Sequence, residues 1–177
     1  MLKTFFKLIS IGCFISLTAF GQTKSQDIFE LARSGNVNSF ISIIEKEPSV
    51  VNSIDPKGFS LLILACYNGN DEVAEYLIEN SKDLNFLSPQ GTALAACVFK
   101  NKIKWAHLLL SKGASPNIAG ANGETPLILA IMTQNEEMVK LLLKYKTDKT
   151  LKDKFQKTAF LYALETQNYN IINLLKN

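Results

Sequence analysis

The stretch that decides the fold reads Gly123-Glu124-Thr125-Pro126-Leu127-Ile128-Leu129-Ala130, followed shortly by Glu137-Met138-Val139-Lys140-Leu141-Leu142-Leu143. Thr125 can cap a helix with its side-chain oxygen, and proline is tolerated at the first helical position after such a cap. The second segment repeats apolar residues at the spacing of one helix face. The two segments therefore predict a pair of short helices separated by a tight break.

The same pattern occurs five times along the chain. A small residue deep in an apolar stretch marks each copy, at intervals of 33, 32, 33 and 33 residues: Ala32, Ala65, Cys97, Ala130 and Ala163. Five residues before each marker stands a potential helix cap: Asp27, Ser60, Thr92, Thr125 and Thr158. Four or five residues after it stands an asparagine, which tolerates left-handed backbone and caps well: Asn36, Asn70, Asn101, Asn135 and Asn168. One such pair cannot bury its apolar faces alone, so the period predicts an all-α solenoid.

These residues resemble the ankyrin repeat, whose signature runs Gly-x-Thr-Pro-Leu-His-x-Ala-Ala, Gly-His-x-Glu-Val-Val-x-Leu-Leu-Leu and Gly-Ala-Asp-Val-Asn. The third unit supplies Leu108-Leu109-Leu110-Ser111-Lys112-Gly113-Ala114-Ser115-Pro116-Asn117, and the second Gly58-Phe59-Ser60 and Gly69-Asn70-Asp71-Glu72-Val73. The resemblance covers roughly residues 26 to 177. It implies about five helix–turn–helix units joined by hairpin-like loops, at approximately 26–55, 56–88, 89–120, 121–153 and 154–177.

The chain departs from the family pattern in two ways. The histidine of the signature is replaced throughout, by Ile63, Ala95, Ile128 and Leu161. We expect apolar contacts between neighbouring repeats to take its place. The first and last units are degenerate, which is the behaviour expected of repeats that cap the ends of a solenoid.

The first residues have the pattern of a secretory signal peptide. Lys3 and Lys7 precede an uncharged apolar stretch from Leu8 to Phe20, and Ala19-Phe20-Gly21 places small residues before a cut at Gln22. We expect residues 1–21 to be removed, residues 22–25 to form a short linker, and the mature protein to be periplasmic or secreted.

Two alternatives to cleavage remain. A membrane anchor is disfavoured because the apolar stretch has 13 residues, short of the roughly 20 that span a bilayer. A lipid on Cys13, which follows Gly12, would anchor the protein, although Ser10 and Ile11 fit that signal poorly.

Removal of residues 1–21 lowers the formal net charge from +3 to +1, because two lysines are lost. This balance disfavours nucleic acid as a partner.

Little in the sequence supports catalysis. His107 is the single histidine, and no nucleophile elbow, phosphate-binding loop, zinc motif or dinucleotide fingerprint occurs. Cys66 and Cys97 fall at packed positions, where thiols are inert. The acidic pairs Asp71-Glu72 and Glu136-Glu137 fall at predicted helix starts, where negative charge complements the helix dipole. We therefore expect a non-enzyme without a metal or cofactor.

Partner binding is expected at positions that repeat stacking leaves free, namely the hairpin tips and the open side of the first helices. The candidates are Arg33, Lys57, Phe59, Tyr67, Phe99, Lys100, Glu124, Met132, Lys154, Phe155 and Lys157. Aromatic residues are enriched at interface hot spots; alternatively, each ring folds back over its own hairpin. Basic residues outnumber acidic ones in this set, which favours an acidic partner.

Adjacent repeats should bring Phe59, Tyr67 and Phe99 onto one concave patch bordered by Lys57 and Lys100. The sequence thus predicts an exported, monomeric protein–protein interaction module. An inhibitor or immunity-type partner in the cell envelope is the specific interpretation. A structural or protective scaffold for an envelope enzyme is the alternative, and an enzyme is the remote one.

Overall fold

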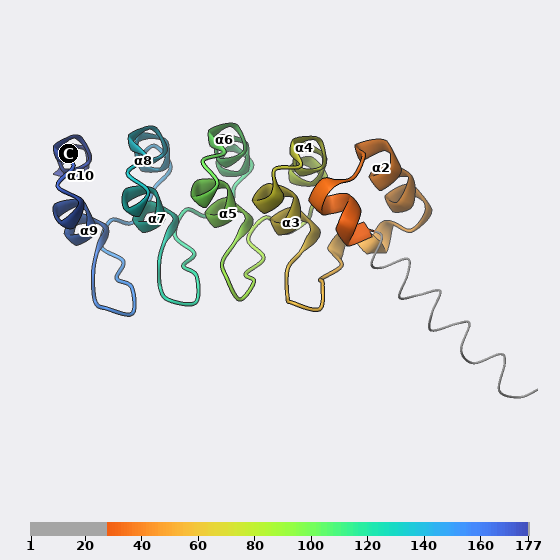
Figure 1. Ribbon diagram of the computed structural model, residues 1–177, viewed down its shortest axis with the longest axis horizontal. Coiled ribbons are helices and arrows are strands. Elements are labelled where there is room, and N and C mark those ends of the chain that lie inside the picture. The colour runs from red at the N-terminus through yellow and green to blue at the C-terminus, as the bar shows by residue number, and fades with distance from the viewer. Residues whose placement is uncertain (1–27, 177) are drawn as a thin grey trace, which may run out of the picture.

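The computed structural model describes residues 28–176. Their helices form pairs that stack side by side into an elongated solenoid, without a β-strand among these residues (Figure 1). The predicted signal peptide, the 22–25 linker, Cys13 and the Asp27 cap all lie outside the described residues. The all-α solenoid predicted from the repeat period is confirmed.

Each repeat contributes a first helix and a second helix. The first helices are residues 28–34, α3 (Leu61–Asn68), α5 (Ala93–Phe99), α7 (Pro126–Met132) and α9 (Ala159–Thr166). The second helices are α2 (Val37–Lys46), α4 (Asp71–Asn80), α6 (Ile103–Ser111), α8 (Glu136–Leu143) and α10 (Tyr169–Lys176). A short 3-10 helix, η1 (Pro48–Asn52), follows α2. Figure 1 shows the second helices along one edge and the hairpins projecting from the opposite side, next to the first helices.

The predicted caps start the first helices. The side-chain oxygens of Ser60, Thr92, Thr125 and Thr158 each accept a hydrogen bond from the backbone N–H three residues later. Pro126 occupies the first turn of α7, as the sequence indicated. One capping hydroxyl per repeat therefore fixes where each of these helices begins.

The asparagines mark the break between the two helices, but they divide over two positions. Asn36, Asn135 and Asn168 accept hydrogen bonds from first-turn amides of the second helix. Asn101 instead has left-handed backbone with φ of 54°, and Lys102 takes the cap position after it. In the second, fourth and fifth repeats the residue with left-handed backbone is Gly69, Gln134 and Gln167, respectively.

The cap position of the second helix also ties each repeat to the one before it. The Asn70 side-chain amide donates to the carbonyls of Leu31 and Gly35, at 2.9 and 3.0 Å. Side chains at the same position make the other three connections, Lys102 to Asp71, Asn135 to Asn101 and Asn168 to Glu136. These polar contacts join neighbouring repeats in a chain that lacks the family histidine.

The core runs the length of the solenoid. First helices pack on first helices and second helices on second helices, and both Leu127 and Leu142 are fully buried, as predicted. The apolar residues that replace the family histidine are also buried at Ile63, Ala95 and Ile128. Ile63 and Ile128 belong to the hydrophobic core, whereas Ala95 lies outside it.

The last repeat differs from this pattern. Leu161 and Leu164 on α9 are 44% and 47% exposed, whereas Ile128 and Ile131 at the same positions of α7 are fully buried. This repeat, which was expected to act as a cap, keeps the apolar residues of an interior repeat at these two positions, and no described residue covers them.

The hairpins are short, and those that begin at Asp55, Gly120 and Asp153 share one pattern of backbone hydrogen bonds. Isolated backbone bridges close them at Ile54 with Ser60, Ser88 with Gly91, and Lys152 with Thr158. The hairpin that begins at Ser88 is one residue shorter, which accounts for the single 32-residue interval. Among the described helices, none has the length and apolar character needed to cross a membrane.

Candidate functional site

A hollow of about 500 Å³ opens on the face formed by the first helices and the hairpins. Gly91, Ala95 and Ala96 of the third repeat line it, beside Phe59 and Tyr67 of the second repeat. Phe99 and Leu129 also line it, and Arg33 of the first repeat reaches its edge. The hollow is therefore centred on the junction between the second and third repeats.

Two alanines make this hollow possible. Ala95 and Ala96 on α5 stand where α3 carries Ile63 and Leu64, and where α7 carries Ile128 and Leu129. An alanine lacks the branched end that Ile or Leu would extend over the helix surface. The side chains at these positions therefore extend less far from the helix in the third repeat than in the second and fourth repeats.

Two exposed aromatic rings form one rim of the hollow. Tyr67 and Phe99 stack with 6.3 Å between ring centroids and 5° between ring planes, although they are 44% and 55% exposed. The Lys100 ammonium lies 4.5 Å from the Tyr67 ring centroid, within cation–π range. The rings contact each other across the repeat boundary, and each stabilises the orientation of the other.

Phe59 has a different environment. Its ring is half-buried and packs against the hydrophobic core while also lining the hollow. The structure thus brings the three predicted aromatic residues together, but Phe59 contributes to folding as well as to the surface. Tyr67 and Phe99 are the rings that can be truncated without opening the core.

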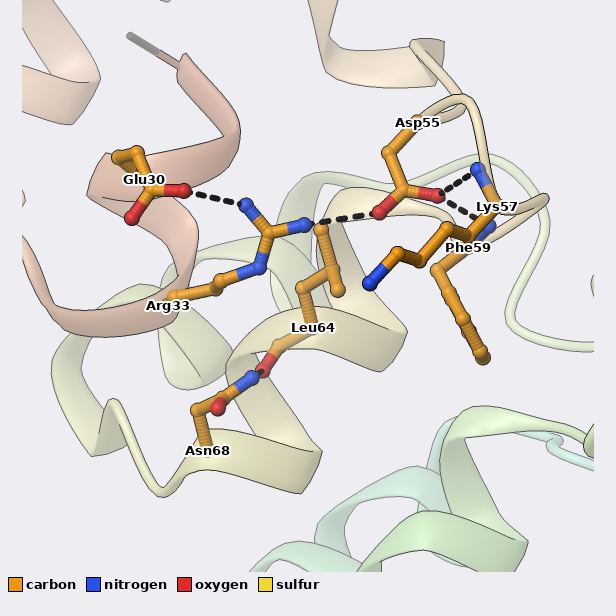
Figure 2. A network of polar contacts seen from close by, with 7 residues as sticks. All are labelled: Glu30, Arg33, Asp55, Lys57, Phe59, Leu64 and Asn68. Carbon is orange, nitrogen blue, oxygen red and sulfur yellow. Dashed lines mark hydrogen bonds and ion pairs between the residues drawn. The ribbon is translucent and has the colours of Figure 1, made fainter. Parts of the chain in front are cut away.

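Arg33 connects the first repeat to the hairpin of the second (Figure 2). Its guanidinium donates to Glu30 Oε1 at 2.7 Å and to Asp55 Oδ2 at 2.8 Å. The other Asp55 oxygen accepts the backbone N–H groups of Lys57 and Phe59, both at 2.9 Å. Arg33 therefore positions the hairpin that carries these two residues, and its charge is neutralised by its two partners.

Asp55 is a residue that sequence reasoning missed. Its side chain is 2% exposed, and its hydrogen bonds hold the hairpin in shape. The signal was present, because Asp153 stands at the same position of the fifth repeat and accepts the N–H groups of Phe155 and Lys157 in the same way.

Apart from Arg33, the basic residues near the hollow are Lys57 and Lys100. Neither forms an ion pair with a carboxylate among the described residues, in contrast to Arg33 and to Lys157, which pairs with Glu165 at 2.6 Å. Lys57 lines the hollow and Lys100 lies over the Tyr67 ring at its rim, so two positive charges without a carboxylate partner stand near the hollow.

The other predicted candidates lie on the fourth and fifth repeats, outside the hollow. Met132 is 48% exposed at the position on α7 that Tyr67 and Phe99 hold on their helices. Phe155 is 63% exposed at a hairpin tip, with the Lys154 ammonium 5.1 Å from its ring centroid. Glu124 and Lys157 are half-buried. The structure does not bring these five residues into one cluster with the aromatic rim.

The fifth-repeat hairpin is closed by an internal contact. Tyr162 donates its hydroxyl to Asp153 Oδ2 at 2.5 Å. This hydrogen bond, with partial burial, raises the pKa of Tyr162 to about 12. Burial raises the pKa of Asp153, but the hydrogen bonds from Tyr162, Lys157 and Phe155 outweigh it and leave that pKa below its ordinary value.

The chemically reactive side chains are placed where they have little reactivity. Cys66 and Cys97 are buried and free, and a hydrogen bond of the Cys97 thiol to Cys66, together with burial, raises the pKa of Cys97. A thiol with a raised pKa is a poor nucleophile. His107 is exposed, as predicted, with its ring 6.1 Å from that of Tyr145. The acidic pairs lie in the first turns of α4 and α8.

Comparison with known proteins agrees with the repeat geometry. The family described as "Ankyrin repeats (3 copies)" matches residues 28–120 and 113–177. The chain belongs to the ankyrin-repeat family. Ankyrin repeats bind other proteins, and the chain is therefore a protein–protein interaction module.

Its relatives occur in several kinds of organism. A putative ankyrin repeat-containing protein of Treponema pallidum is 34% identical over 62% of this chain and 37% of that protein. Human Rabankyrin-5 is 31% identical over 77% of this chain and 13% of its own length. The tyrosine-protein kinase HTK16 of Hydra vulgaris is 27% identical over the whole chain and 26% of the kinase. The chain thus spans between 13% and 37% of the length of these relatives.

Proposed function

We propose that this ankyrin-repeat protein binds one partner protein through the face that carries the hollow. The observation that carries this proposal is the stacked pair Tyr67 and Phe99, which stays about half exposed beside an unfilled hollow. Exposed aromatic side chains held in a fixed orientation lose little conformational entropy on binding, and they are enriched at interface hot spots.

We propose further that the protein acts as an exported monomer. The basis is the sequence of residues 1–21, in which a short basic region, an apolar stretch and small residues before Gln22 follow one another. N-terminal sequencing of the protein from its native cells tests this step. A chain that starts at Gln22 agrees with export, whereas a retained Met1 contradicts it. A lipid on Cys13 would show an anchored protein instead.

Within the envelope we propose an inhibitor or immunity-type role, in which the protein binds and shields another protein. A structural or protective scaffold for an envelope enzyme is the second candidate, and both use the same face. The two roles differ in outcome, because an inhibitor lowers the activity of its partner and a scaffold preserves it.

Affinity purification of the mature protein from its native envelope, followed by mass spectrometry, tests the binding function. We expect one intact partner in stoichiometric amount. An assay of that partner's activity with and without the protein then separates inhibition from protection. Recovery of no stoichiometric partner under native conditions would contradict the proposed function.

A further inference from the structure

The hollow is an unusual feature in a stack that is otherwise closely packed. At the corresponding positions α3 and α7 carry larger side chains, namely Ile63 and Leu64 on α3, and Ile128 and Leu129 on α7. At the third repeat Ala95 and Ala96 are only 4% and 9% exposed. They form part of the floor of the hollow, beside the larger side chains of Ile63, Leu64 and Leu129, which also line it.

The lining of the hollow suits an apolar group. Besides the two alanines, the aliphatic side chains of Ile63, Leu64 and Leu129 and the three aromatic rings border it. A volume of about 500 Å³ is ample for one aromatic or large aliphatic side chain. Burial of the apolar lining and of the inserted side chain away from water would favour binding.

The charges around the hollow favour carboxylates next to that apolar group. Lys57 on the hairpin and Lys100 at the end of α5 form no ion pair with the described carboxylates. Asp55 is the acidic residue that lines the hollow, and its charge is matched by Arg33. Lys57 therefore lines the hollow, and Lys100 lies beside it over the Tyr67 ring, both without a carboxylate partner among the described residues.

We propose that the hollow receives one large aromatic or aliphatic side chain from an acidic segment of the partner protein, whose carboxylates lie against Lys57 and Lys100. This proposal rests on the proposed binding function and specifies the chemistry of the partner. The apolar side chain supplies most of the affinity, and the two lysines attract the acidic segment and fix its orientation.

Selection from a random displayed peptide library on the immobilised mature protein tests the proposal. We expect enrichment of sequences with Trp, Phe or Leu flanked by Asp or Glu. In Ala96→Leu, the residue found at this position of the second and fourth repeats fills the hollow, and we expect selected peptides to bind at least about tenfold more weakly. Circular dichroism and thermal unfolding verify that the variant is folded.

A second set of variants does not depend on how the helix accommodates a larger side chain. Phe99→Ala should weaken peptide binding by about tenfold or more, whereas Phe155→Ala, which truncates an equally exposed ring outside the hollow, should leave it unchanged. Lys57→Glu with Lys100→Glu should slow association and remove its salt dependence, and Lys154→Glu should not.

The outcomes separate this inference from the proposed function. If enriched peptides lack the acidic–aromatic pattern, or bind Ala96→Leu and Phe99→Ala as tightly as wild type, the hollow is not the site. The binding function then still stands if the wild-type protein captures its stoichiometric partner. If wild type selects no peptides and captures no partner, both proposals are overturned.

Discussion

The second and third repeats share a scaffold with the fourth and fifth, but the two halves differ in the face they present. In both, a hydroxyl caps each first helix and a polar side chain ties each second helix to the repeat before it. The second and third repeats add a hollow, stacked rings and lysines without carboxylate partners. In the fourth repeat Ile128 and Leu129 occupy the positions of the two alanines, and in the fifth Lys157 pairs with Glu165.

The comparison shows that stacking and recognition use different positions of the repeat. Positions that contact neighbouring repeats keep an apolar residue in every copy; the position of Leu94 and Leu127, for example, holds Phe29, Leu62 and Phe160 in the other copies. Positions on the open face change from copy to copy, as Tyr67, Phe99 and Met132 do. A difference between the two halves at the open face is therefore a difference in what they can bind.

The largest effect should come from the shared scaffold. Leu127→Ala and Leu142→Ala each remove a fully buried side chain, and each should lower the free energy of unfolding by about 2–5 kcal/mol. Leu94→Ala, at the position equivalent to Leu127 in the third repeat, should cost a similar amount. Urea unfolding measures all three. A loss below about 0.5 kcal/mol in any of them would contradict the common scaffold.

The open face should show the opposite behaviour. Tyr67→Ala should weaken binding of the captured partner by about 2–4 kcal/mol, with little change in the free energy of unfolding because the ring is 44% exposed. Met132→Ala, at the same position on α7, should leave binding nearly unchanged. Isothermal titration calorimetry makes the comparison. Equal losses for the two variants would show that the whole ridge binds.

The two aspartate hairpins should differ in how they depend on charge. Asp55→Asn keeps an oxygen for the hairpin amides but removes the ion pair with Arg33, so it should destabilise the protein by about 1–2 kcal/mol. Asp153→Asn should cost less, because its side-chain partner is the neutral Tyr162 hydroxyl of the same repeat. Thermal unfolding of the two variants decides this. A larger loss for Asp153→Asn would contradict the role given to Arg33.

The smallest effect concerns Tyr162. Its pKa is raised to about 12 by the hydrogen bond to Asp153, so this contact contributes stability in full below pH of about 10 and loses it as the pH rises toward 12. Ultraviolet titration should show a tyrosine that ionises near pH 12, and Asp153→Asn should bring the pKa of Tyr162 back toward 10. An unchanged titration in that variant would exclude the hydrogen bond as the cause.

Much of the scaffold could be predicted from the sequence because its signals are local. A capping hydroxyl, an apolar helix face and a polar turn residue lie within a few positions of one another and recur at a fixed period. The position of Asn101 was less predictable, since an asparagine suits both the left-handed turn and the cap that follows it. The exposure of Leu161 depends on the absence of a covering neighbour, which local sequence does not encode.

The candidate site was predictable in part. The clustering of Phe59, Tyr67 and Phe99 followed from the repeat period alone. The pair of Arg33 with Asp55 did not, because the residues are 22 positions apart in different repeats and the guanidinium must cross between them. The hollow could have been found from Ala95 and Ala96 by comparing side-chain sizes down each column of the repeat.

Hydrogen–deuterium exchange of the protein with and without its captured partner tests the central claim most directly. The account predicts that the partner slows exchange in the hairpin and first helix of the second and third repeats, residues 55–68 and 88–100. It predicts little change in the hairpin at residues 153–158 or in the second helices α8 and α10. Protection confined to those helices or to the fifth repeat would contradict the assignment of the binding face.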